Sequence, residues 1–307
     1  MIIGAGPAAL TAAIYTTRED IQTILYEKQV IGGLAAVTDK IDNYPGFRDG
    51  VAGLELSEQM RQQAERFGAQ IILDEVSSIK PVDQHIELTT YAGIVKARTV
   101  LIATGSDYNK TGVKGEAEYL SKGIHYCATC DGAFYRDQKV VVVGGGNSAV
   151  QDAIFLTRYT KHIDLLVRST IKASEVLKKE LAKYVENGLI SVHLSEIPTE
   201  FIANENQIGL AKVKTHNTLT NTNQEYFVDG AFILIGLRPN TQFLAGSGVE
   251  LDQIGLVKTD NKLQTNLPGV FAAGDVRSGA TMQIASASGE GASAALAIRE
   301  YLNNFKK

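Results

Sequence analysis

The stretch of sequence that indicates the fold occurs twice, as MIIGAGPAALTAA at residues 1–13 and as VVVVGGGNSAVQDA at residues 140–153. Each copy begins with an apolar run, passes through glycines and other small residues, and continues in helix-forming residues. This order predicts a strand, a tight turn and a helix, the G-x-G-x-x-A pattern of a dinucleotide-binding fold. Small residues are needed because the backbone and the helix N-terminus must approach a pyrophosphate closely. A single loop is also typical of an ordinary tight turn, whereas two matching copies favour two dinucleotide sites.

The segments after each glycine loop correspond as well. In both copies a second strand is followed by a β-meander and then by one more apolar strand that stops at glycine. These predicted segments are residues 21–26, 79–97 and 100–105 in the first copy, and residues 162–167, 201–228 and 231–236 in the second. The chain therefore predicts an α/β fold with two Rossmann-like, three-layer ββα domains.

The last third of the chain returns to the first domain. Residues 267–276 predict a strand that ends in an acid, and residues 283–301 predict a helix rich in small residues. The expected domain limits are residues 1–110 with 241–307 for the first domain, and residues 111–240 for the second, which is inserted into it.

Charge and hydropathy exclude several classes of function. The formal charge is −4, and the 30 Lys and Arg residues are scattered, so no basic patch for nucleic acid is expected. No apolar run is long enough for a membrane span, and no basic segment precedes an apolar run at the N-terminus, so we expect a cytoplasmic protein. The first strand is short, and we expect a few further residues ahead of Met1.

The two cysteines of the chain stand together, as Cys127 and Cys130 in YCATCD. A structural zinc site needs four ligands, and none of the five histidines has a metal-ligand spacing to this pair, so no metal is expected. A thiolate can donate electrons to a flavin or attack a disulfide, so a redox pair is favoured over an inert one. The nearby His125 is expected to be a packing or surface histidine rather than a base.

The two glycine loops, CATCDG at residues 127–132 and FAAGDV at residues 271–276 together resemble the low-molecular-weight thioredoxin reductase family along the whole chain. The resemblance implies that the first domain binds FAD and that the second binds NADPH and carries the cysteine pair. It also implies a homodimer that reduces thioredoxin or a similar small disulfide protein. The two domains are then expected to rotate about linkers at residues 110–115 and 237–241.

The resemblance also assigns roles to the residues of the redox pair. Cys130 is expected to face the flavin, Cys127 to attack the disulfide of the partner protein, and Asp131 to carry protons between them and solvent.

The FAD motifs of the family match short segments of this chain. Glu27, 23 residues after Gly4, would accept hydrogen bonds from ribose hydroxyls. Asp275 would bond the ribitol, with the following helix N-terminus favouring negative charge on reduced flavin, although an acid there also suits a simple helix cap. Leu34 and Met282 depart from the family, which usually has glutamine and arginine there. The implied FAD residues are Gly4, Gly6, Pro7, Ala8, Glu27, Gly32, Gly33, Asn43, Thr104, Gly105, Gly274, Asp275 and Gln283.

The second fingerprint departs further from the family. Val167 stands 23 residues after Gly144, where an acid would mark NADH. The family signature for the 2′-phosphate of NADPH, HRRxxxR, is reduced here to Arg168 and Lys172, so we expect a weak preference for NADPH. The implied NADPH residues are Gly144, Gly146, Asn147, Ser148, Ala149, Arg168 and Lys172.

Three alternatives stay open on this scaffold. The reduced signature permits a non-nicotinamide donor of the ferredoxin type. It also permits an FAD- and oxygen-dependent dithiol oxidase. A non-enzymatic flavin redox sensor is disfavoured, because a sensor has no need of an acid beside its cysteine pair.

Overall fold

The computed structural model describes residues 1–38, 40–203 and 209–305 and divides the chain into two compact units. Unit 1 comprises Met1–Asp107 and Arg238–Lys307, and unit 2 comprises Tyr108–Leu237. Residues 204–208 of the second expected meander lie outside the described residues.

The chain passes between the units within two paired strands, β8 (Ser106–Tyr108) and β17 (Leu237–Pro239). Both crossings lie before the limits of 110 and 241 expected from the sequence. The pairing of these two strands was not predicted, because three-residue strands have little alternation to detect.

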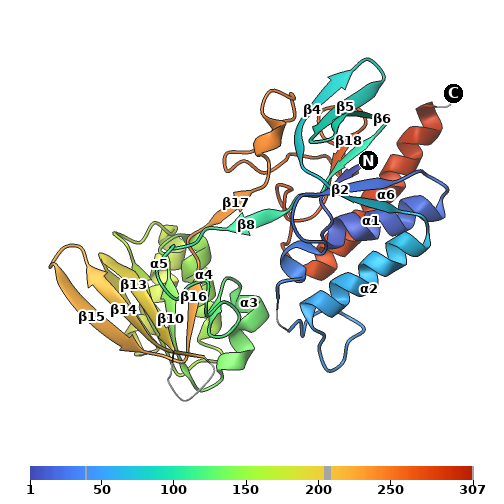
Figure 1. Ribbon diagram of the computed structural model, residues 1–307. Coiled ribbons are helices and arrows are strands. Elements are labelled where there is room, and N and C mark those ends of the chain that lie inside the picture. Colours follow the sequence, from blue (N-terminus) through green and yellow to red (C-terminus); the bar gives the residue numbers. More distant parts are fainter. Residues whose placement is uncertain (39, 204–208, 306–307) are drawn as a thin grey trace. The chain divides into compact units, whose positions relative to one another are not determined.

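Unit 1 is built on a parallel five-stranded sheet in the order β18-β7-β1-β2-β3. Helices cover one face of this sheet and an antiparallel meander covers the other (Figure 1). The sheet strands are β1 (Ile2–Ile3), β2 (Ile24–Glu27), β3 (Gln70–Leu73), β7 (Val100–Ile102) and β18 (Val270–Ala272). The helices are α1 (Pro7–Arg18), α2 (Gly53–Arg66) and α6 (Ile284–Phe305), and the meander strands are β4 (Val76–Val82), β5 (His85–Thr90) and β6 (Gly93–Ala97).

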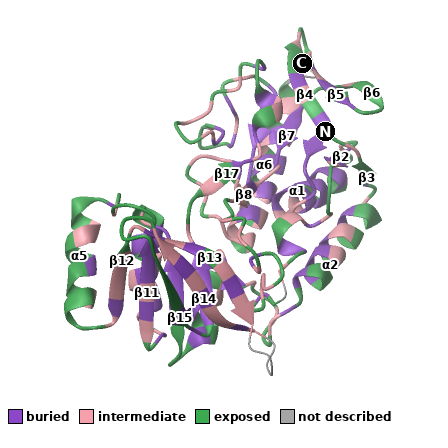
Figure 2. Cartoon of the chain, turned by 60° about the vertical axis from the view of Figure 1, so that its left-hand side comes forward, coloured by how far each residue is buried: buried purple, intermediate pink, exposed green. Residues whose placement is uncertain are grey.

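Side-chain alternation explains the three layers. Ile2 and Leu101 pack against the helices, whereas their neighbours Ile3 and Ile102 pack against the meander. Because successive residues of a strand point to opposite faces, a sheet covered on both sides needs continuous apolar runs. Figure 2 accordingly shows α1 and β7 as largely buried.

Small residues let α1 and α6 pack closely. A Cβ on Gly291 of α6 would collide with the main-chain carbonyl of Ala8 in α1, so the alanine-rich composition of this pair follows from backbone contact.

Unit 2 repeats this architecture with the strand order β12-β11-β10-β16-β9. Strands β10, β11, β12 and β16 take the places that β1, β2, β3 and β7 have in unit 1. The fifth strand differs in origin: β18 comes from the C-terminal segment, whereas β9 lies just before the cysteine pair. The sheet strands are β9 (Ile124–His125), β10 (Lys139–Val143), β11 (His162–Val167), β12 (Ile190–Leu194) and β16 (Gly230–Ile233). The helices are α3 (Ala128–Asp131), α4 (Asn147–Leu156) and α5 (Glu175–Glu186), and the meander strands are β13 (Glu196–Ala203), β14 (Leu210–Asn217) and β15 (Thr222–Phe227).

Some element limits differ from the expected ones. Strand β2 begins at Ile24 rather than at residue 21, because the Ile21 N–H bonds back to Thr16 at the end of α1. Helix α4 begins directly after the glycine loop, at Asn147. No helix among the described residues is long and apolar enough to cross a bilayer.

Candidate dinucleotide and redox sites

The first glycine loop joins β1 to α1 in a shape that only glycine allows. Gly4 has a φ of +102°, and a Cβ there would collide with the carbonyl oxygen of Ala103. Gly6 is the N-cap of α1, Pro7 is its first residue, and a Cβ on Gly6 would meet nothing within 4 Å. The N-terminus of α1 is thus open above Gly6, as an approaching pyrophosphate requires.

The carboxylate of Glu27 fixes this loop from the end of β2. Its Oε2 accepts the Ala5 N–H at 2.8 Å, and its Oε1 accepts the Gln29 N–H at 2.8 Å. Each carboxylate oxygen has a second lone pair, so Glu27 can still accept bonds from ribose hydroxyls.

A second glycine pair lies against the first loop. Gly32 has a φ of +102°, and a Cβ there would collide with Ser57. A Cβ on Gly33 would lie 3.7 Å from the Cα of Gly6, so the two sequence-predicted loops are neighbours. Leu34, which departs from the family, is 41% exposed.

Asp275 lies in a turn that a partly buried ion pair between Arg277 and Glu290 holds. The Gly274 N–H donates to Glu290 at 2.8 Å, and Arg277 donates to the same carboxylate at 2.6 Å. Burial, followed by the charge of Glu290, raises the pKa of Asp275 to about 6. Asp275 is not the cap of α6, which begins only at Ile284, so the alternative of a simple cap is wrong.

Thr104 and Gly105 close the same edge of unit 1. The Thr104 hydroxyl donates to the carbonyl of Asn240 at 2.7 Å, so its proton is already engaged in a hydrogen bond within the protein. Gly105 has a φ of +65°, and a Cβ there would meet nothing within 4 Å.

Unit 1 therefore fits FAD. The loops that carry Gly4, Glu27, Thr104 and Gly274 all follow the carboxyl ends of parallel strands, which meet at one edge of the sheet, where such folds bind ligands. Glycines with open space above them, a carboxylate with free acceptor sites and a partly buried acid meet there.

The second glycine loop has the same geometry in unit 2. Gly144 has a φ of +148°, and a Cβ there would collide with the carbonyl of Leu234. Gly146 is the N-cap of α4 and is open, while Ala149 is fully buried beneath the loop. The side chain of Asn147 accepts the Ser174 N–H at 2.8 Å and so holds the segment between β11 and α5. Ser148 is exposed.

The two expected phosphate-binding cations lie beside this loop. The Lys172 N–H donates to the carbonyl of Gly145 at 2.7 Å, which ties the turn to the glycines. Arg168 and Lys172 are exposed, and neither forms an ion pair with a carboxylate in the described part of the chain. Val167 is buried, so the position of the NADH-marking acid is occupied by a core residue. These cations fit a phosphate bound at the loop.

Cys127 and Cys130 form a disulfide that directly follows β9. Cys127 is the N-cap of α3, and its Sγ accepts the Cys130 N–H at 3.2 Å. Cys130 is exposed and Cys127 is partly buried. Across the described ranges, no three His, Cys, Asp or Glu side chains gather as a metal site would need.

His125 and Tyr135 form a buried chain of hydrogen bonds with the acid beside this disulfide. His125 Nδ1 lies 3.1 Å from Asp131 Oδ2, and His125 Nε2 lies 2.6 Å from the Tyr135 hydroxyl. His125 is buried, as a packing histidine would be, but its bond to Asp131 was missed. Asp131 is the last residue of α3, which follows β9, and spacing alone does not reveal that its carboxylate returns to His125.

Glu116 is a second residue that the sequence did not reveal. It is 3% exposed, and its carboxylate accepts bonds from Thr111, from the Gly112 N–H and from the Tyr126 hydroxyl at 2.9 Å. The Tyr126 ring stacks on Tyr108 of β8 with centroids 5.3 Å apart. The residue before Cys127 is thereby fixed to the strand that enters unit 2.

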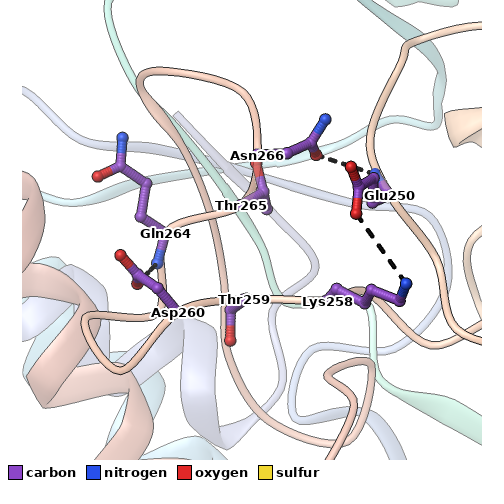
Figure 3. Close-up of a pocket in the computed structure, with 7 residues that line it drawn as sticks. All are labelled: Glu250, Lys258, Thr259, Asp260, Gln264, Thr265 and Asn266. Carbon is purple, nitrogen blue, oxygen red and sulfur yellow. Dashed lines mark hydrogen bonds and ion pairs between the residues drawn. The ribbon is translucent and has the colours of Figure 1, made fainter.

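A surface hollow in unit 1 is distinct from these sites (Figure 3). Within it, Asn266 accepts the Glu250 N–H and Asp260 accepts the Gln264 N–H, each at 2.9 Å. Both hydrogen bonds stabilise turns of the chain. The described residues that line the hollow include none of those predicted to bind FAD.

Comparison with known proteins gives one consistent family. The pyridine nucleotide-disulphide oxidoreductase family matches residues 1–291. A thioredoxin reductase of Listeria innocua is 36% identical over 313 residues, covering 100% of this chain and 94% of that protein. A thioredoxin reductase of Streptomyces clavuligerus is 39% identical over 306 residues, covering 98% and 93%. The crystal structure of a thioredoxin reductase from Streptococcus pyogenes has a TM-score of 0.93 at 36% identity, covering 99% and 97%. Proteins of this family depend on FAD and NADPH.

Proposed function

Because this chain belongs to the pyridine nucleotide-disulphide oxidoreductase family, we propose that it is a thioredoxin reductase. It passes electrons from NADPH through FAD and the Cys127–Cys130 disulfide to thioredoxin. The observation that carries the proposal is this disulfide, formed between residues three apart at the carboxyl edge of a dinucleotide-binding sheet. Such a short loop constrains the unfolded chain little, so a purely structural role is disfavoured.

Unit 1 is the FAD domain in this proposal. The open helix N-terminus at Gly6 and Pro7 binds the pyrophosphate, Glu27 binds the ribose, and Asp275 binds the ribitol. FAD, when bound, supplies the group that exchanges two electrons with both a nicotinamide and a dithiol. Asn43 and Gln283, which bond each other at 3.1 Å, complete this site.

Unit 2 is the NADPH domain. Gly144 and Gly146 bring the backbone to the pyrophosphate, and Arg168 with Lys172 meets the 2′-phosphate. The preference for NADPH over NADH is weak, because only Arg168 and Lys172 remain of the basic residues in the family signature.

The cysteine pair carries the electrons to the partner protein. The Cys127 thiolate attacks the disulfide of thioredoxin and forms a mixed disulfide. Cys130 then attacks Cys127 Sγ, which releases reduced thioredoxin and restores the Cys127–Cys130 disulfide. The Cys130 N–H at 3.2 Å from Cys127 Sγ supports Cys127 as the attacking thiolate, because an N–H donor stabilises that anion. Asp131 supplies and removes the protons.

The proposal includes a homodimer in the cytoplasm. A dithiol that NADPH keeps reduced is suited to a reducing compartment. The dimer follows from the resemblance to low-molecular-weight thioredoxin reductases.

The experiment is anaerobic mixing of the yellow protein with NADPH, NADH or reduced ferredoxin, while flavin absorbance is followed. Thioredoxin is then added. NADPH should bleach the flavin, and thioredoxin should restore its colour. Bleaching by ferredoxin alone contradicts the proposed donor, and peroxide formation with a small dithiol but no reaction with thioredoxin indicates the oxidase instead.

A further inference from the structure

We propose that His125 is a positioning residue for Asp131, and that it holds this carboxyl group through a hydrogen-bonded chain that ends at Tyr135. The inference rests on the proposed function, because it concerns the acid that serves the redox pair. It adds two buried residues to the proton chemistry of that pair.

The contacts of His125 leave its ring one orientation. Nδ1 lies 3.1 Å from Asp131 and Nε2 lies 2.6 Å from the Tyr135 hydroxyl, so both ring nitrogens are engaged. The imidazole stacks on Phe232 at 5.4 Å between ring centroids and meets the Tyr135 ring edge-on at 5.4 Å. His125 is 8% exposed and Tyr135 is 7% exposed, so water does not compete for these bonds.

The fold makes room for this arrangement. A Cβ on Gly230 of β16 would collide with the Tyr135 ring, so glycine at this position lets the phenol reach His125. His125 itself is fixed by pairing of β9 with β16, where it lies opposite Phe232.

The bonding pattern of the chain has one consistent direction when Asp131 is ionised. The Tyr135 hydroxyl donates to Nε2, and the Nδ1–H then donates to the carboxylate. Burial, and then the charges of Asp131 and Asp229, raise the pKa of Tyr135, which keeps the phenol protonated as this pattern requires.

The same chain can reverse when Asp131 is protonated. The carboxyl then donates to Nδ1, and the Nε2–H donates to the Tyr135 oxygen. Two hydrogen bonds within the chain are kept in both states of Asp131, which lowers the cost of moving a proton onto or off this acid. The titratable groups that face the chain are Asp131 from α3, Tyr135 from the following turn and Asp229 from the segment before β16, while β16 contributes the uncharged Phe232.

A dithiol reagent isolates the proton step. A dithiothreitol thiolate attacks Cys127 Sγ, the S–S bond breaks, and its electron pair leaves on Cys130 Sγ. The second dithiothreitol thiolate attacks the mixed disulfide, which releases the Cys127 thiolate and cyclic oxidised dithiothreitol, so two electrons have moved to the protein. The Asp131 carboxyl protonates the Cys130 thiolate, and solvent returns a proton to Asp131.

The test is the rate of this reduction as a function of pH in the flavin-containing protein, corrected for the fraction of dithiothreitol thiolate. The corrected rate should fall at high pH, and Asp131→Asn should abolish this descending limb of the pH profile. The assay needs neither NADPH nor thioredoxin, so failure of the proposed function and failure of this inference give different results.

His125→Ala removes a donor from the Asp131 carboxylate, so the descending limb should move to higher pH by about one unit. His125→Asn restores an amide donor and should return the limb toward its original position. Tyr135→Phe keeps the ring packing but removes the hydroxyl that selects the His125 tautomer. It should therefore move the descending limb in the same direction as His125→Ala, but by a smaller amount.

The matched control is His193→Ala. His193 bonds Asp164 at 2.8 Å in the same unit but on β12, and its loss should leave the limb in place. An unmoved limb in His125→Ala overturns the inference, as does an equal shift in His193→Ala or a wild-type profile without an Asp131-dependent limb. Should His125→Ala not fold, an unmoved limb in Tyr135→Phe overturns it.

Discussion

The side-chain amide of Asn43 donates a hydrogen bond to Gln283 at 3.1 Å, across 240 positions of sequence. Asn43 belongs to the N-terminal part of unit 1, and Gln283 directly precedes α6 in the C-terminal part. Two segments that are separated by the whole of unit 2 thus meet at residues that the sequence assigns to one cofactor. FAD binding should therefore depend on both segments.

Loss of the Glu27 carboxylate should weaken FAD binding. In Glu27→Ala the ribose loses an acceptor and the Ala5 N–H loses its partner, so we expect the FAD dissociation constant to rise about tenfold or more. Titration of the apoprotein with FAD, followed by flavin fluorescence, measures this change. Lys28→Ala, which alters an exposed neighbour, is the control, and an equal loss in both variants would contradict the role of Glu27.

The buried acid Asp275 predicts a pH dependence of stability. Its pKa is raised from 3.8 to about 6 in the folded protein, so the native state binds the additional proton between these values. The free energy of unfolding should therefore fall as pH rises through this window, by at most about 3 kcal/mol. The destabilisation that the ionised Asp275 carboxylate causes is fully present above pH 6 and absent below pH 3.8.

The variant Asp275→Asn should remove this slope and stabilise the apoprotein at pH 8, while weakening its retention of FAD. Urea unfolding at pH 5 and pH 8 measures the slope, with the exposed Asp49→Asn as control. A slope that Asp275→Asn leaves unchanged would show that another group causes it.

The order of the cysteines predicts which variant traps the partner. Cys130→Ser lacks the resolving thiol, so it should accumulate a mixed disulfide between Cys127 and thioredoxin. Cys127→Ser should form none and should instead show a long-wavelength charge-transfer band after reduction, with Cys130 beside the flavin. Non-reducing electrophoresis and absorbance spectra decide between this order and the opposite one.

The exposed Arg168 predicts how the two nicotinamide cofactors are distinguished. Only NADPH carries a 2′-phosphate, so Arg168→Ala should raise KM for NADPH about ten- to a hundredfold and leave KM for NADH nearly unchanged. Steady-state kinetics with both cofactors measure this, and Lys179→Ala on the exposed face of α5 is the control. Equal changes with both cofactors would exclude Arg168 as a phosphate-binding residue.

The sequence predicted the family and the three-layer fold correctly, because their signals are local and repeated. Gly4 and Gly144 follow apolar strands and have the positive φ that such loops need, so a pattern of adjacent residues was sufficient. Strand limits were less accurate, because two- and three-residue strands give little alternation to detect.

Residues that act through tertiary contacts were missed. Glu116 and Glu290 are carboxylates whose partners include backbone N–H groups, and no spacing rule identifies such pairs. His125 was considered, but its bond to Asp131 depends on the path of the chain from β9 through α3, which spacing does not reveal. Carboxylates that act through such tertiary contacts are therefore found from structure rather than from sequence.

The most direct test of the electron route is an anaerobic titration with NADPH. FAD and a disulfide each accept two electrons, so the wild type should consume about two equivalents of NADPH per chain, and the double variant Cys127→Ser, Cys130→Ser only about one. Thioredoxin added afterwards should reoxidise the wild type and leave the double variant reduced. Equal consumption by both proteins, or reoxidation of the double variant by thioredoxin, would contradict a route through Cys127 and Cys130.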